Sequence, residues 1–277
     1  MRLLPWRSCV SPNHAAQRIR RRYEMMINDG HLFSGNSEEE KFLSRMIFVG
    51  LLQEKMKAKG EMPSQQNRQL HQETSKEEIA NSISHGIGVL LSIAGLVLLI
   101  VLAARSGSGW QVVSFSIFGG TLIILYLAST LYHSLPMSRV KQVFKIIDHS
   151  AIFLLIAGTY TPFMLLNLRG PWGWSLLGVI WALAILGILM KIIYISKFRK
   201  ISVAFYVFMG WLAIIAFKEI IAHVPPLSLT FLILGGFSYT IGLVFYAWRK
   251  LPYHHVVWHI FVIGGSTFHY LAVWFTL

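Results

Sequence analysis

Cysteine and acidic residues are scarce in this chain of 277 residues. Cys9 is the only cysteine, so no disulfide can form within one chain and staple its fold. Charged residues of both signs make up 13% of the sequence, whereas a soluble domain contains about 25%. Hydrophobic residues account for 55% of the chain, and its mean hydropathy is +0.56. This composition excludes an ordinary soluble domain and indicates an integral membrane protein.

The net charge of +13 is distributed in a way that argues against a nucleic-acid partner. Residues 1–76 contain 13 Lys and Arg against 8 Asp and Glu, and residues 77–277 contain 12 against 4. In the second part the basic residues lie in short gaps between apolar runs, which is typical of membrane topology. We therefore expect no binding to nucleic acid.

Residues 1–76 differ from the rest of the chain in being polar and basic. Their start lacks the apolar core, roughly 7–15 residues long, of a signal peptide. Residues 61–72 are polar and rich in glutamine, which favours disorder, whereas residues 38–59 show the periodicity of a peripheral amphipathic helix. We predict a largely disordered extension with no function of its own.

From residue 77 onward, seven apolar runs alternate with short breaks of glycine, proline and basic residues. Each run is close to the roughly 20 residues that a helix needs to cross a bilayer. Residues 77–277 are therefore predicted to form an all-α domain, a bundle of seven transmembrane helices. The predicted segments are approximately 83–104, 112–134, 146–168, 172–194, 201–222, 227–248 and 255–276.

The basic residues between the runs predict the orientation of this bundle. The second, fourth and sixth gaps hold nine Lys and Arg, whereas the odd gaps hold three. By the positive-inside rule, the N-terminus lies in the cytoplasm and the C-terminus outside.

Three histidines lie at the predicted cytoplasmic ends of apolar runs. His255 and His259 are one helical turn apart and share a face, and His133 ends the second run. Each histidine taken alone is more often an ordinary interfacial residue, but ionisable groups gathered at one membrane depth mark functional sites. Three imidazoles could hold Zn²⁺ and leave its fourth position open to water.

Two more polar residues lie at the same predicted depth. Asp148 begins the third run, and it could bind the ion directly or hydrogen-bond the water beside it. Ser129 lies one turn before His133 and could orient that water or a substrate carbonyl. We regard both as candidate catalytic residues. His269 lies toward the outer half of the last run and is predicted to form an interhelical hydrogen bond.

Three motifs, occurring in order, resemble those of the progestin and adipoQ receptor family, and the whole sequence resembles its bacterial branch, the hemolysin III proteins. The resemblance covers residues 76–277. It implies seven helices, a cytoplasmic N-terminus, zinc ligands at His133, His255 and His259, and a location in the bacterial inner membrane. The motifs are Glu78-x-x-Asn81-x-x-x-His85, Ser129-x-x-x-His133 followed by Asp148, and His255-x-x-x-His259 with His269 ten residues on.

The resemblance also suggests an activity, because the wider superfamily includes membrane ceramidases. It implies a multi-pass protein of membrane-lipid homeostasis, with membrane lipids, an acyl lipid or a fatty acid as ligands, and hydrolysis of a lipid amide as one hypothesis. The alternative is a non-enzymatic sensor or receptor of lipid or membrane state. A cytolytic pore is disfavoured, because a secreted lytic protein has to be soluble before it inserts.

Overall fold

The computed structural model describes residues 75–277 apart from residues 107, 137 and 195–198. The predicted extension, with its amphipathic helix over residues 38–59, thus lies almost entirely outside the described residues, and both stay predictions. Residues from Glu73 to Leu277 form one compact unit. Within its described part the regular structure is helical throughout, with no strand.

Seven helical segments of this unit are long and apolar enough to cross a membrane, which confirms the predicted fold class. Their outward faces carry large apolar side chains, such as Leu90 with 69% of its surface exposed, as expected for contact with lipid. In chain order the elements are α4 (Ser75–Ser106), α5 (Gly109–Ser134), α6 (Arg139–Pro162), the π-helix η2 (Phe163–Asn167), α7 (Pro171–Tyr194), α8 (Arg199–Trp211), the 3-10 helix η3 (Leu212–Ala216), α9 (Phe217–His223), α10 (Pro226–Ala247) and α11 (His254–Trp274).

Two helices begin earlier than the apolar runs predict. Helix α4 starts at Ser75 rather than near residue 83, and α6 starts at Arg139 rather than near residue 146. Hydropathy marks only the apolar part of a helix, whereas polar first turns depend on local interactions. The Ser138 side chain caps α6 by accepting a hydrogen bond from the Lys141 N–H at 3.2 Å.

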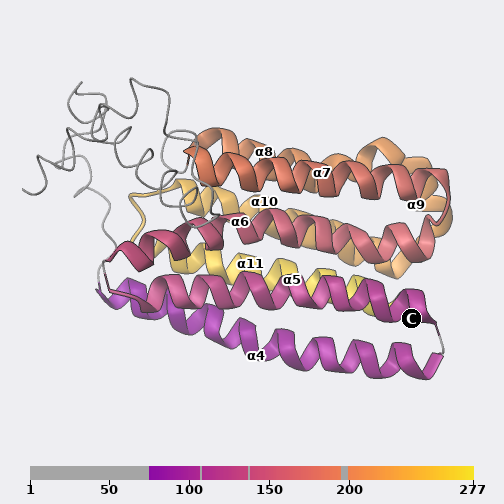
Figure 1. Ribbon diagram of the computed structural model, residues 1–277, viewed down its shortest axis with the longest axis horizontal. Helices are drawn as coiled ribbons and strands as arrows, with labels where there is room; N and C mark the ends of the chain where they lie inside the picture. The colour runs from indigo at the N-terminus through magenta and orange to yellow at the C-terminus, as the bar shows by residue number, and fades with distance from the viewer. Residues whose placement is uncertain (1–74, 107, 137, 195–198) are drawn as a thin grey trace, which may run out of the picture. The chain divides into compact units, whose positions relative to one another are not determined.

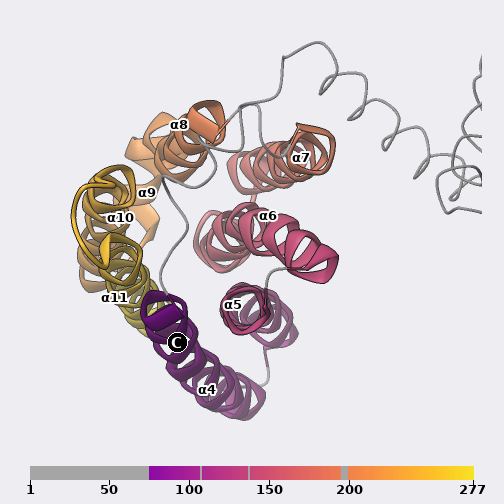
Figure 2. The same ribbon diagram turned by 90° about the vertical axis from the view of Figure 1, so that its left-hand side faces the viewer.

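Neighbours in the chain pack against each other from α4 to α7, and α11 lies between α10 and α4. Viewed end-on, α5, α6 and α7 form one row, beside an arc of α4, α11, α10 and α8 (Figure 2). Glycine permits the close approach of α4 to α5, because a Cβ atom on Gly88 would lie 2.5 Å from the ring of Tyr126.

Two of the seven segments depart from regular α-helix. Pro162, which lacks an N–H group, ends α6, and the π-helix η2 follows. Helix α8 gives way to the 3-10 helix η3, and the Tyr160 hydroxyl of α6 reaches this break. It accepts from the Ala213 N–H at 2.8 Å and donates to the Met209 carbonyl at 2.9 Å. Backbone groups freed by the break are therefore satisfied inside the protein.

Candidate metal centre

The three histidines predicted to bind a metal do come together. His133 lies in the last turn of α5, and His255 and His259 lie in the first turns of α11. One nitrogen from each ring lies within 4.8 Å of the other two. His133 and His259 are buried and His255 is half-buried. The spacing therefore allows all three imidazoles to share one ion.

Helix α11 is set in place by the residue that precedes it. Tyr253 adopts a left-handed conformation with φ of 56°, which is uncommon for a residue other than glycine. Its N–H donates to Glu77 Oε1 at 3.0 Å, and its carbonyl accepts from the Val257 N–H of α11. This junction starts α11 at His254, so that His255 and His259 turn toward α5.

Residues of α4 lie within hydrogen-bond distance of the Nδ1 atom of two of these histidines. His133 Nδ1 lies 2.8 Å from Glu78 Oε2, and His259 Nδ1 lies 3.1 Å from Ser84 Oγ and 3.3 Å from the Asn81 carbonyl oxygen. A carboxylate and a carbonyl can only accept, and the Ser84 hydroxyl donates its own proton to the Asn81 carbonyl, so each Nδ1 carries the proton and donates. Each Nε2 then keeps its lone pair, which is the tautomer that a metal ligand requires. The side chains present therefore fit a divalent ion.

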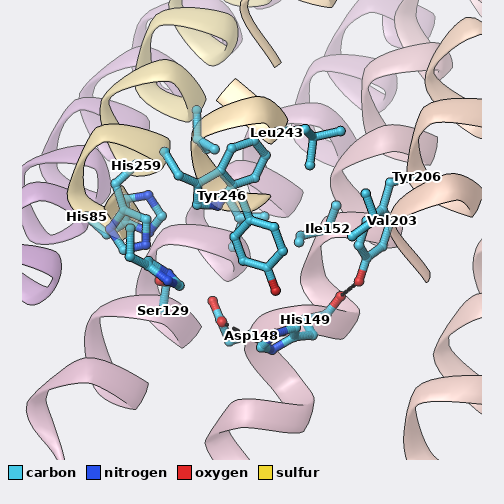
Figure 3. A pocket seen from close by; sticks show the side chains of 14 residues that line it. His85, Ser129, Asp148, His149, Ile152, Val203, Tyr206, Leu243, Tyr246 and His259 are labelled. Atoms are coloured by element: carbon cyan, nitrogen blue, oxygen red, sulfur yellow. Dashed lines mark hydrogen bonds and ion pairs between the residues drawn. The ribbon is translucent and has the colours of Figure 1, made fainter. Parts of the chain in front are cut away.

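A small cavity of about 40 Å³ is lined by His255 and His259, and it is here named the polar pocket after the histidine, aspartate and serine side chains among its mainly apolar lining. Asp148 directs its carboxylate into this pocket, Ser129 lies beside it, and the Tyr246 hydroxyl reaches down from α10 toward Asp148 and His149 (Figure 3). Asp148 is outside the group of mutually close metal-ligating atoms. Its position suits a partner of a bound water better than a fourth ligand.

His85 of α4 also lines the polar pocket. It is 4% exposed, and its ring stacks on that of His259 with centroids 3.5 Å apart. Among the described residues, neither of its ring nitrogens has a hydrogen-bond partner, and the same holds for Ser129 Oγ. Buried polar atoms are nearly always paired, so these unpaired atoms make His85 and Ser129 candidates for contact with a ligand in the pocket.

Three further histidines in the described part of the chain lie outside the group of candidate metal ligands. His149 Nδ1 donates to the Lys145 carbonyl at 2.7 Å, and His254 likewise lies outside the group of candidate metal ligands. His269 Nε2 donates to the Leu232 carbonyl of α10 at 3.2 Å. The predicted interhelical hydrogen bond of His269 is thus confirmed.

Comparison with known proteins gives this arrangement a family context. The family described as "Haemolysin-III related" matches residues 73–270. The chain belongs to this family. The Hemolysin-3 homolog of Bacillus subtilis (strain 168) is 52% identical over 202 residues, which cover 73% of this chain and 95% of the relative. Hemolysin-3 of Bacillus cereus is 49% identical over 200 residues, 72% and 91% of the two chains. The human Monocyte to macrophage differentiation factor is 28% identical over 207 residues, 73% and 84% of the two chains.

This haemolysin-III-related chain also contains a much larger cavity, here named the apolar cavity, of about 730 Å³. It extends between α6, α8, η3, α10 and α11 and is lined mainly by aliphatic and aromatic side chains. Its wall is shared in part with the polar pocket, so one layer of side chains separates the two. The six shared residues are Leu125, Ile152, Tyr206, Leu243, Trp258 and Val262.

Sequence reasoning assigned no chemical role to Glu78 or Lys141. Lys141 is 6% exposed, and its ammonium donates to Glu78 Oε1 at 2.7 Å and to the Leu135 carbonyl at 3.1 Å. A signal was present for Glu78, which shares a helical face with Asn81 and His85. For Lys141 there was none, because its charge fits the positive-inside pattern of a solvated loop.

Proposed function

We propose that this chain is a zinc-containing protein of the bacterial inner membrane, with a cytoplasmic N-terminus, that binds an acyl lipid and hydrolyses its amide or a related bond. Its role would lie in membrane-lipid homeostasis. One observation carries the proposal: the polar pocket, which is lined by two of the three clustered histidines, shares a wall with the apolar cavity. A ligand with a polar carbonyl group and a long apolar chain matches these two compartments.

The apolar cavity has the size and lining expected for an acyl chain. Ligand sites for small molecules have volumes of roughly 300–1,000 Å³ and mostly apolar walls. Each methylene group buried in such a site contributes about 0.8 kcal/mol to binding. The histidines at the neighbouring pocket favour zinc among the divalent ions, because imidazole is a preferred zinc ligand and three protein ligands leave a catalytic position open.

A zinc ion held by His133, His255 and His259 would polarise a carbonyl oxygen and acidify a nearby water. Asp148 accepts a proton from the attacking water, whose oxygen bonds to the carbonyl carbon. The Ser129 hydroxyl donates to the carbonyl oxygen as negative charge develops there. When the carbon–nitrogen bond breaks, Asp148 returns the proton to the amine, so the products are a fatty acid and an amine.

A sensor of lipid or membrane state is the second candidate. The small volume of the polar pocket, about 40 Å³, favours it, because little space is left for a headgroup beside the histidines. The ligand would then occupy the apolar cavity without turnover. Cytolysis, which the names of the two Bacillus relatives suggest, accounts for neither compartment.

The test uses the full chain, purified in lipid nanodiscs, loaded with Zn²⁺ and given a panel of N-acyl amides and acyl esters. Fatty-acid release is measured by mass spectrometry. We expect wild type to cleave at least one substrate, Asp148→Asn to lower kcat by about 100-fold or more, and His133→Ala to abolish release. Glu219→Gln, an exposed carboxylate at the opposite end of the bundle, is the matched control and should act as wild type.

The result also separates the two candidates. If zinc-loaded wild type cleaves nothing in the panel but retains lipid, hydrolysis is wrong. The sensor then predicts that Asp148→Asn supports normal membrane composition in cells and that loss of a histidine ligand does not.

A further inference from the structure

The group of charged residues behind His133 joins three helices, with Lys141 and His133 buried and the Glu78 side chain 22% exposed. Glu78 comes from the first turns of α4, Lys141 from the first turn of α6, and His133 from the last turn of α5. Lys141 and His133 are 6% and 4% exposed. Burying a charge away from water is costly unless it is paired and hydrogen-bonded, so the buried Lys141 ammonium requires a partner held in place.

The two oxygens of Glu78 have different partners. Oε2 accepts from His133 Nδ1 at 2.8 Å, and Oε1 accepts from the Lys141 ammonium at 2.7 Å. Lys141 also donates to the Leu135 carbonyl, just beyond the end of α5. With one oxygen held by Lys141, the carboxylate cannot rotate away from the imidazole. A carboxylate is the side chain that can accept from both donors at once.

We propose that Glu78, clamped by Lys141, is the positioning residue of the metal centre: it fixes the ring orientation and the Nδ1–H tautomer of His133. This inference rests on the proposed zinc site, toward which His133 presents Nε2. Neither Glu78 nor Lys141 touches the ion or the substrate. Carboxylates that hold a ligating histidine in this way typically change metal affinity by about 10–100-fold when they are removed.

Glu78→Gln tests the clamp because glutamine has one accepting oxygen for two donors. Zn²⁺ affinity of the full chain in nanodiscs is measured by chelator competition, and the d–d spectrum of the Co²⁺-loaded protein reports on ligand geometry. We expect Glu78→Gln to weaken Zn²⁺ binding by about 10–100-fold and to alter the Co²⁺ spectrum. Ser82→Ala is the matched control, since it removes a contact of α4 with Ser134 of α5 and leaves His133 untouched.

Lys141→Met turns the experiment into a double-mutant cycle. Without Lys141, the single accepting oxygen of the substituted glutamine can face His133, so Glu78→Gln should cost roughly threefold less affinity, or better, in this background. An equal cost in both backgrounds would overturn the clamp. Wild-type affinity in Glu78→Gln, with an unchanged Co²⁺ spectrum, would overturn the positioning role altogether.

A measurement on metal-free protein separates this inference from the zinc proposal. In ¹⁵N-histidine-labelled wild type, the His133 resonances, assigned by their loss in His133→Asn, should show a proton fixed on Nδ1. In Glu78→Gln they should show a mixture of tautomers. If wild type binds no Zn²⁺ but the tautomer shift is present, the proposed function fails and the positioning by Glu78 stands. A mixed tautomer already in wild type overturns the positioning.

Discussion

The two sides of the helix bundle differ in regularity and in packing. On one side α4 and α5 are continuous helices in close contact, with Gly88 directly against the ring of Tyr126. On the other side α8 breaks into a 3-10 helix, and a Cβ atom on Gly210 would meet no neighbour within 4 Å. The close side, together with the first turns of α11, holds the histidines, whereas α8 and η3 on the open side border the apolar cavity.

This contrast teaches how one small bundle can meet two opposite requirements. Metal ligands must be held within a fraction of an ångström, which needs close packing and satisfied hydrogen bonds behind them. A site for a flexible acyl chain needs space, which irregular helices provide. The two sides should therefore respond separately to substitution.

Loss of a histidine ligand should have the largest effect and should be confined to the close side. His255→Ala is expected to weaken Zn²⁺ binding by roughly a thousandfold, or about 4 kcal/mol. Lipid retained by the purified protein, measured by mass spectrometry, should stay as in wild type. Equal loss of zinc and lipid would show that the two compartments are one site.

A pair of glycine substitutions compares the packing of the two sides directly. Gly88→Ala forces a methyl group against the buried ring of Tyr126 and should lower the free energy of unfolding by about 1–3 kcal/mol. Gly210→Ala meets no neighbour and should raise it by about 0.5–1 kcal/mol, because alanine favours helix. Thermal unfolding in detergent measures both, and a fall of equal size for each would remove the contrast.

Filling the apolar cavity should affect lipid but leave zinc in place. Leu232→Trp places a larger ring in its wall and should reduce retained lipid by about tenfold, or about 1.4 kcal/mol. Leu234→Trp, two residues along α10, is the control, because Leu234 is 42% exposed and does not line the cavity. Undiminished lipid in Leu232→Trp would argue that the ligand lies elsewhere.

The smallest effect is expected at the break in the fifth segment. Tyr160→Phe leaves the Ala213 N–H without its acceptor and should cost about 1 kcal/mol of stability. Tyr270→Phe is the counterpart on the close side. It removes a bond to the Gly95 carbonyl of the continuous helix α4, and it should cost less. Hydrogen exchange at the Ala213 amide should accelerate in Tyr160→Phe alone.

Much of this architecture could be predicted from the sequence because the membrane reduces the possibilities. Apolar runs of the length of a bilayer must be helices, and His255 and His259 must share a face at that spacing. The meeting of His133 with them follows from seven short-looped helices, since the end of the second and the start of the seventh lie on one side of the membrane.

The unpredicted features depend on tertiary contacts that hydropathy does not encode. From the sequence alone Lys141 is interpreted as a charged loop residue. Only the fold, which brings the first turns of α4 and α6 to the same end of α5, places its ammonium against Glu78. The 3-10 helix after Trp211 contains no proline from which it could be predicted. It is stabilised instead by the Tyr160 hydroxyl of α6, which accepts from the Ala213 N–H. Both features depend on contacts between residues far apart in the sequence, which a local pattern cannot predict.

The left-handed conformation of Tyr253 has a consequence for how the loop before α11 can vary in length. Adding one residue to a helix turns everything beyond it by about 100°, which would carry His255 and His259 off their shared target. Extra residues inserted ahead of Tyr253 can bulge into water, whereas the same insertion after it would rotate the metal ligands away. The conformation of Tyr253 therefore fixes the residue at which α11 begins, whatever the length of the loop before it.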